Sequence, residues 1–466
     1  MGDGTMSRRR LWWAAVVLAP VLVLTGAASS LLLWRLTDAV RGGTSTASGA
    51  VAPAVRRAVH APPAAAGQLP PLDGGTAVDA PPADPAFARA STTVSVQDVH
   101  AALGRRTAAL RAHNEKAFLA TFDAGRPALV TTERILFRNL VKLPLVSPSY
   151  LESQVTGSST SRRAYVSLAH QIRGVDAEAA ELTKVETFVR RKGAVVTTAV
   201  AAVRGQPSTR YAPLDQVPLT VTNGRLVTVV STRDVGDATG VSATAERAAA
   251  AVLAVWGSRP GPSRFVVFAT RDQKAVGTWF GAGSAPFQAA GATMLQVALR
   301  HPTRYTGSRV IVDLSQSSGE ALYRVLRHEF THAVDVRAQT VPRGNAVQNY
   351  PTWVEEGMAA WVEELDVPVA GTSAVQSLRV LRQYWNHQLP PDSRDAFYVN
   401  SDRGAYNYAL AATVYRYVDT RWGTSRAIGF YAAFAAGTPS AAFSSLGTDR
   451  AGFVSGWGAW VDAQLA

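Results

Sequence analysis

The stretch "ALYRVLRHEFTHAVDVRA", Ala321–Ala338, carries the clearest structural signal in this chain. Apolar residues recur along it at the spacing of an amphipathic helix, and His328 and His332 are four residues apart. Residues four apart on a helix lie one turn above one another on the same face, so both imidazoles can reach one metal ion. The stretch therefore predicts a helix that carries two ligands of a metal site.

Glu329 directly follows the first histidine and points about 100° away from it around the helix. From there the carboxylate cannot easily ligate the metal, but it can hold a water molecule that is bound to the metal. Zinc lowers the pKa of such a water to about 7, so a neighbouring base can take its proton. Glu329 is therefore the predicted general base, which would later return the proton to a leaving amine.

The residues before this helix agree with the prediction. The apolar run "RVIVDL", Arg309–Leu314, predicts a strand, and Ser317–Glu320 fit a capping box at the start of the helix. We interpret Arg309–Leu314 as an edge strand that could pair with an extended substrate.

A third ligand is expected in "PTWVEEGMAAWVEEL", Pro351–Leu365, which predicts a second helix with an apolar stripe. Either Glu355 or Glu356 could complete a site of two histidines and one glutamate, which leaves a fourth position for water. Periodicity alone does not choose between the two.

The pair "HEFTH" and "PTWVEEGMAAW" resembles the gluzincin metallopeptidases, most of all the bacterial peptidase MA-like domains. In that family the metal ligand is the glutamate directly before the glycine. The resemblance therefore implies His328, His332 and Glu356 as zinc ligands and Glu329 as general base. It covers roughly residues 240–440 and implies a mostly helical, thermolysin- or aminopeptidase-like zincin domain with a small sheet over 240–466.

The segment "AYNYALAATVYRYVDTRWG", Ala405–Gly423, is similar to the helix that follows the site in this family. The resemblance implies that a tyrosine there stabilises the oxyanion, and we prefer Tyr406 to Tyr408. Thermolysin-like enzymes have an aspartate four residues after the ligand glutamate, where this chain has Ala360. We therefore expect Asp335 or Glu363 to orient the histidines instead.

Composition narrows the chemistry further. The chain has no cysteine, which excludes disulfides, thiolate ligands and a cysteine nucleophile, so a metal site must use His, Asp and Glu. The net charge is +13, but the arginines are scattered and no nucleic-acid-binding motif is present. We therefore expect no nucleic acid as partner.

The N-terminus predicts export. Arg8–Arg10 precede the uncharged, mostly apolar run Leu11–Trp34, which as a helix would reach about 36 Å and cross a membrane. We predict a cytoplasmic tail over 1–10, a transmembrane signal anchor over 11–34 and an extracytoplasmic remainder. Cleavage as a signal peptide, followed by secretion, is the alternative.

Two regions separate this anchor from the metal motif. Residues 35–93 are rich in Pro and Ala without a period, which is typical of a linker. Residues 94–235 predict helices followed by hairpins, one of them at Asn223-Gly224. This α+β accessory domain resembles the cone-shaped nuclear-transport-factor-like domains around "RTAALRAHNEKAFLATFD", Arg106–Asp123.

The sequence thus predicts an α+β protein with an N-terminal transmembrane helix, a cone-like domain and a zincin domain. Its predicted function is that of a membrane-anchored zinc metallopeptidase that hydrolyses a peptide or protein substrate outside the cytoplasm. The main alternative is a non-catalytic, zinc-containing scaffold of the cell envelope that binds a partner through residues 94–235. Zinc-dependent hydrolysis of a non-peptide envelope substrate is a further alternative. Glu329 favours an enzyme, because a scaffold has no structural need for it.

Overall fold

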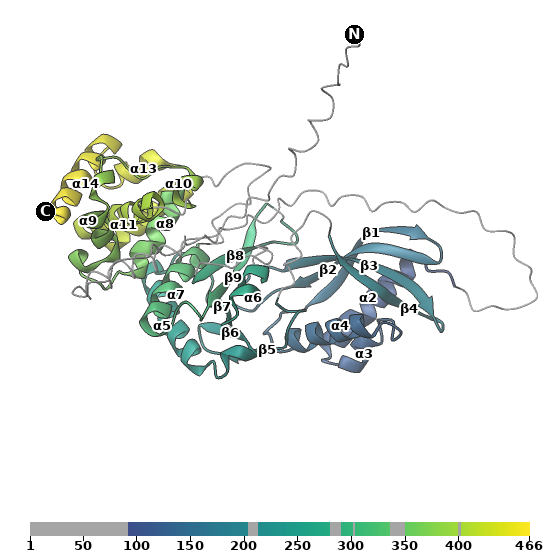
Figure 1. The fold of residues 1–466 in the computed structure, drawn as a ribbon. Coiled ribbons are helices and arrows are strands. Elements are labelled where there is room, and N and C mark those ends of the chain that lie inside the picture. The colour runs from purple at the N-terminus through teal and green to yellow at the C-terminus, as the bar shows by residue number, and fades with distance from the viewer. Residues whose placement is uncertain (1–91, 204–212, 280–289, 302, 336–349, 399–401) are drawn as a thin grey trace, which may run out of the picture.

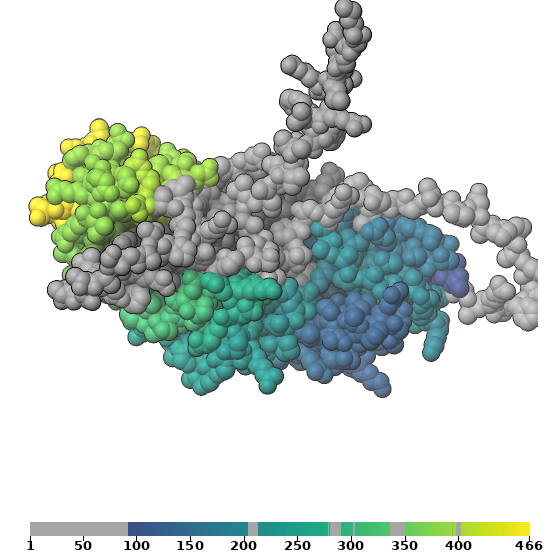
Figure 2. Space-filling model, in the orientation of Figure 1, coloured from purple at the N-terminus to yellow at the C-terminus, as the bar shows by residue number. Residues whose placement is uncertain are grey.

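The computed structural model describes residues 92–203, 213–279, 290–301, 303–335, 350–398 and 402–466. Within them the protein is α+β, with a four-stranded sheet of order β1-β2-β3-β4 and a five-stranded sheet of order β5-β6-β7-β9-β8 (Figure 1). In the space-filling view the five-stranded region lies between the N-terminal sheet and the C-terminal helices (Figure 2).

The N-terminal sheet is antiparallel throughout and packs against three helices. Its interior includes the buried Arg106, whose guanidinium lies 2.8 Å from a carboxylate oxygen of Glu186. The first helix begins with a capping box made by Ser95 and Asp98. The elements are α2 (Val96–Arg111), α3 (Glu115–Leu119), α4 (Pro127–Leu140), β1 (Ser149–Ser158), β2 (Ser161–His170), β3 (Ala180–Arg191) and β4 (Ala194–Ala202).

The five-stranded sheet is mixed. Its first two strands form the hairpin predicted at Asn223-Gly224, which is confirmed. The pairs β6–β7 and β7–β9 are parallel, whereas β8 pairs antiparallel with β9 and lies at the edge of the sheet. The strands are β5 (Leu219–Asn223), β6 (Val227–Thr232), β7 (Phe265–Thr270), β8 (Gly291–Val297) and β9 (Tyr305–Asp313).

Helices α5 (Thr239–Trp256) and α7 (Gly319–Val334) pack against each other, and α7 also packs on β8 and β9, while α6 (Gln273–Trp279) contacts β7 and β9. The loop between β2 and β3 covers the other face of β9. There Arg309 donates to both carboxylate oxygens of Asp176, at 2.7 and 2.8 Å, and a Cβ at Gly307 would lie 2.0 Å from Asp176 Oδ1. This buried ion pair joins the two sheets.

The C-terminal part is helical. Helix α11 lies at its centre and is buried along most of its length. Helix α8 packs closely on α11, because a Cβ at Gly357 would lie only 2.6 Å from the carbonyl oxygen of Ala411. The helices are α8 (Thr352–Glu363), α9 (Ser373–Val380), α10 (Arg394–Tyr398), α11 (Asp402–Trp422), α12 (Thr424–Ala435), α13 (Pro439–Ser444) and α14 (Arg450–Leu465).

Two predictions about the fold need correction. The predicted fold class is wrong where it includes a transmembrane helix, because no helix in the described ranges is both long and apolar enough to cross a membrane. The run predicted for that role, 11–34, lies outside the described residues, as does the linker 35–93, and the predicted extracytoplasmic location stays a prediction. The interpretation of Arg309–Leu314 as an edge strand is also wrong, since β9 lies between β7 and β8.

The predicted domain boundary falls between 235 and 240, yet the hairpin β5–β6, which precedes it, pairs through β6 with β7. The five-stranded sheet therefore draws on residues from both sides of that boundary. The division into an accessory domain over 94–235 and a peptidase-like domain over 240–466 stays a prediction.

Candidate metal centre

The histidines of the HEFTH motif lie on α7, as predicted, and both are buried. Their ring centroids are 4.9 Å apart. The predicted capping box does not form, because Gly319 adopts φ of +53° and the side chain of Ser318 makes no capping hydrogen bond. The helix is held instead by its packing on α5, β8 and β9.

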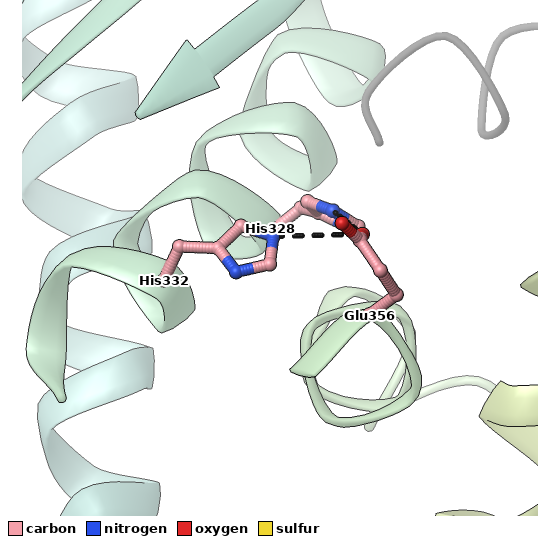
Figure 3. Close-up of side chains that lie close together, drawn as sticks. All are labelled: His328, His332 and Glu356. Carbon is pink, nitrogen blue, oxygen red and sulfur yellow. Dashed lines mark ion pairs between the residues drawn. The ribbon is translucent and has the colours of Figure 1, made fainter. Parts of the chain in front are cut away.

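Glu356 reaches the two histidines from α8. Its Oε2 lies 3.6 Å from Nε2 of His328 and 3.7 Å from Nε2 of His332. Figure 3 shows the carboxylate opposite the two rings, with one helix supplying the histidines and the other the glutamate. One ligand atom from each residue lies within 4.8 Å of the others, so this buried group can hold a metal ion.

Each histidine has a second carboxylate at its other ring nitrogen. Glu363 Oε2 lies 3.1 Å from Nδ1 of His328, and Glu355 Oε1 lies 3.4 Å from Nδ1 of His332. Such contacts fix the orientation and the tautomer of a ligand histidine, and they make its free nitrogen a better donor. Helix α8 thus carries both the third candidate ligand and the two carboxylates that orient the first two.

Asp335 and Glu363 were the two carboxylates predicted to orient the histidines. Of these, Glu363 lies next to a ring nitrogen, Nδ1 of His328. Asp335 lies at the end of α7 and accepts a hydrogen bond of 2.5 Å from the hydroxyl of Tyr431. Burial raises the pKa of Asp335 to about 7. The sequence considered Glu355 only as a ligand and missed its contact with His332.

Glu329 is buried beside the histidines, against strand β8. The hydroxyl of Thr293 lies 2.8 Å from its Oε2 and 2.9 Å from its main-chain oxygen. A Cβ at Gly291 would lie 3.1 Å from Glu329 Cγ and 3.4 Å from Oε1, so the glycine leaves room for the carboxylate. Oε1 makes no hydrogen bond with any described residue. Burial raises the pKa of Glu329 to about 7, although both histidines lower it.

The charges around the histidines suit a cation. Burial lowers the pKa of His328, but contacts with Glu356 and Glu363 outweigh it and raise the pKa to about 10. The pKa of His332 is likewise raised, because Glu355 and Glu356 outweigh burial. Among the described residues no Lys or Arg forms an ion pair with Glu329, whose Oε2 is instead 2.8 Å from the hydroxyl of Thr293. Nε2 of His328 makes no hydrogen bond in the described part of the chain, so a donor atom points at the position that a metal ion would take.

Tyr406 and Tyr408 are both buried in α11. The ring of Tyr406 packs against Tyr384, with centroids 5.7 Å apart, and burial raises the pKa of Tyr406 to about 12. The ring of Tyr408 packs against Phe397. The role of Tyr406 as an oxyanion donor stays a prediction.

Comparison of the chain with models of known protein families, with curated proteins and with solved structures gives no match. The resemblance to metallopeptidases therefore stays a prediction from the two motifs. The geometry of the metal group is independent of that resemblance, because it follows from the packing of α8 on α7.

Proposed function

We propose that this protein is a zinc-dependent peptidase in which His328, His332 and Glu356 bind the metal and Glu329 is the general base. The observation that carries the proposal is the placement of Glu329. It is a buried carboxylate next to the metal group, held through Oε2 by Thr293, with Oε1 free of hydrogen bonds to the described residues.

The donor set supports zinc. Two imidazole nitrogens and one carboxylate oxygen are a ligand set of catalytic zinc sites, which keep a fourth position open. A thiolate site, the other common choice for zinc, is excluded because the chain has no cysteine. When bound, zinc would make a water molecule more acidic and polarise a substrate carbonyl.

The residues of the chain would then perform the proton transfers. Glu329 accepts a proton from the attacking water through Oε1 and delivers it to the amine that leaves, so that no covalent intermediate with the enzyme is needed. Thr293 keeps the carboxylate in place during both transfers.

A peptide substrate is favoured by the strand beside Glu329. Strand β8 pairs with β9 on one side and with no other named strand among the described residues. An extended peptide can add to such an edge through main-chain hydrogen bonds. Because Thr293 lies on this strand, a peptide added there would pass close to Glu329.

The test is a comparison of the full chain with its Glu329→Gln variant. We expect about one bound zinc per chain in both proteins, and cleavage of a peptide library that falls about 10²- to 10⁴-fold in the variant. His328→Ala should lose the zinc as well as the activity. A zinc-loaded protein whose cleavage does not depend on Glu329 would contradict the enzyme and support a zinc-containing scaffold instead.

A further inference from the structure

The hydrogen bonds at the two ends of β8 show which of its main-chain groups point toward β9 and which point away from it. The carbonyl of Ala290 accepts from Asp313, and the amide of Ala298 donates to Arg304, so both groups point toward β9. Backbone groups alternate in direction along a strand. The main-chain groups of Thr293, Leu295 and Val297 therefore point away from β9, toward the edge at which no described strand pairs with Thr293 or Leu295.

This edge closes at one end. The amide of Leu299 points the same way as those of Leu295 and Val297, but it donates to the carbonyl of Ala179, 2.8 Å away, and Ala180 forms a bridge with Ala298. The start of β3 thus occupies the edge just beyond β8. The same antiparallel bridge places Glu181 opposite Val297. The edge is therefore left to a second strand between Gly291 and Leu295, over about 13 Å, enough for roughly four extended residues.

The side chains of β8 also alternate between two environments. Gly291 and Thr293 face α7 and contact Glu329. Leu295 and Val297 follow on the same face, beyond the part that contacts Glu329. They pack against Tyr305 in a small apolar cluster that is separate from the main core, and both are only partly buried.

Tyr305 belongs to this face because of an irregularity in β9. Gln296 pairs with Gly307, but Val297 pairs with Tyr305, so Thr306 is left out of the pairing. A bulge of this kind re-aims the residue next to it. Thr306 instead exchanges hydrogen bonds with Glu178 in the loop between β2 and β3.

We propose that Leu295, Val297 and Tyr305 form an apolar subsite that selects peptide substrates with aliphatic or aromatic side chains. This inference rests on the proposed peptidase function. In a strand added to β8, the residue opposite Leu295 places its side chain on the same face, next to Leu295. The residue opposite Thr293 lies nearest to Glu329, so the selected residue is two positions further from the bond that is cleaved.

The subsite predicts a pattern in the cleaved sequences. An apolar side chain is preferred at one position on one side of the cleaved bond, the position opposite Leu295. The residue between that position and the one opposite Thr293 faces the other way and shows little preference. For Leu against Ser opposite Leu295, we expect a preference in kcat/KM of about tenfold or more.

The experiment profiles cleavage of a peptide library by the zinc-loaded full chain, by Leu295→Lys and by Gln296→Lys. Leu295→Lys should lose the apolar preference at the position opposite residue 295 and gain a preference for Asp and Glu there. Gln296→Lys is the matched control, because its side chain lies on the opposite face of the same strand, and it should keep the original pattern. Binding of a Leu-containing and a Ser-containing peptide to Glu329→Gln, followed by fluorescence anisotropy, provides a readout that does not depend on cleavage.

The outcomes separate this inference from the function on which it rests. Cleavage with no apolar preference at the position opposite Leu295, or a preference that Leu295→Lys leaves unchanged, overturns the subsite and leaves the peptidase intact. A wild-type protein that neither cleaves nor binds peptides overturns both. Leu295→Thr introduces an uncharged, polar residue that is common in strands, so it should reduce the apolar preference without selecting acidic residues. It keeps the test valid if the lysine variant does not fold.

Discussion

Glu355 Oε1 lies 3.4 Å from Nδ1 of His332, on the opposite side of the ring from Glu356, whose Oε2 lies 3.7 Å from Nε2. Two neighbouring residues of α8 therefore approach both nitrogens of one imidazole. Both carboxylates and the ring are buried. A rotation of the ring would break both contacts, so the arrangement holds His332 in the orientation that a metal ligand needs.

Replacing Glu355 with Gln should weaken zinc binding. Loss of a carboxylate that orients a ligand histidine costs about 10- to 100-fold in metal affinity. We expect a loss in this range for Glu355→Gln and Glu363→Gln, measured by competition with a chelating dye. Asp335→Asn is the control, because Asp335 accepts from Tyr431, and it should change the affinity less than threefold. Equal losses in all three variants would contradict the specific role of Glu355.

Replacing Gly357 with Ala should disturb the metal centre through the helix contact. The new Cβ would lie 2.6 Å from the carbonyl oxygen of Ala411, so α8 must move away from α11. We expect a loss of about 1–3 kcal/mol in the free energy of unfolding, and weaker zinc binding, because Glu356 is the preceding residue. Gly429→Ala in α12, where nothing lies within 4 Å of the added atom, should be neutral or stabilising. Urea unfolding of both variants measures the difference.

Replacing Thr293 with Val should affect turnover more than zinc binding. The change keeps the shape of the side chain but removes the hydroxyl that lies 2.8 Å from Glu329 Oε2. We expect kcat to fall about tenfold or more, with the zinc content unchanged, because the general base loses the contact that orients it. Thr293→Ser, which restores the hydroxyl, should recover most of the activity. If Ser and Val behave alike in steady-state kinetics, the hydroxyl does not position Glu329.

Breaking the ion pair between Arg309 and Asp176 should destabilise the junction of the two sheets. Asp176 is fully buried and accepts from Arg309 through both oxygens, so removal of either partner leaves a buried charge. Such a loss costs about 3–5 kcal/mol. Arg309→Met should therefore be less stable than the double variant Arg309→Met with Asp176→Asn, which leaves no unpaired charge. Scanning calorimetry of the two variants checks this order.

The stability of the N-terminal region should fall as the pH rises through neutrality. Burial raises the pKa of Glu133 to about 7 from an ordinary value of 4.5, so the folded state favours the protonated form. The contribution of this group is fully present below pH 4.5 and is lost as the pH rises through 7, by about 3 kcal/mol. Glu133→Gln should flatten the dependence of unfolding free energy on pH between 5 and 8. Glu320→Gln, at an exposed carboxylate, should leave that dependence unchanged.

The sequence was most informative where the chemistry fixes a spacing. Two histidines four apart place both ligands on one helical face, and the glutamate before a glycine matched the family motif, so these residues could be found without the structure. The hairpin at Asn223-Gly224 was equally predictable, because that dipeptide favours the backbone conformation of a tight turn.

The partners of these residues were harder to find. Glu355 and Glu356 are adjacent on a helix, and only the packing of α8 on α7 decides which of their oxygens faces which ring nitrogen. Thr293 lies in a strand without any motif, 36 positions before Glu329 in the chain, so no local pattern connects them. One signal was overlooked, because the consecutive apolar residues Val310–Val312 are typical of a strand buried on both faces rather than of an edge strand.

The concentration of Glu355, Glu356 and Glu363 on one helix has an evolutionary consequence. A one-residue insertion near the start of α8 would turn all three carboxylates by about 100° around the helix axis at once. The candidate ligand Glu356 and the two carboxylates that contact the histidines would then be lost together. Single substitutions can change one carboxylate of the metal centre at a time, whereas an insertion or deletion in α8 displaces all three. Length changes in this region should therefore be tolerated before Pro351 or after Glu364, and a transplant of the centre into another scaffold must carry α8 as a whole, in register with α7.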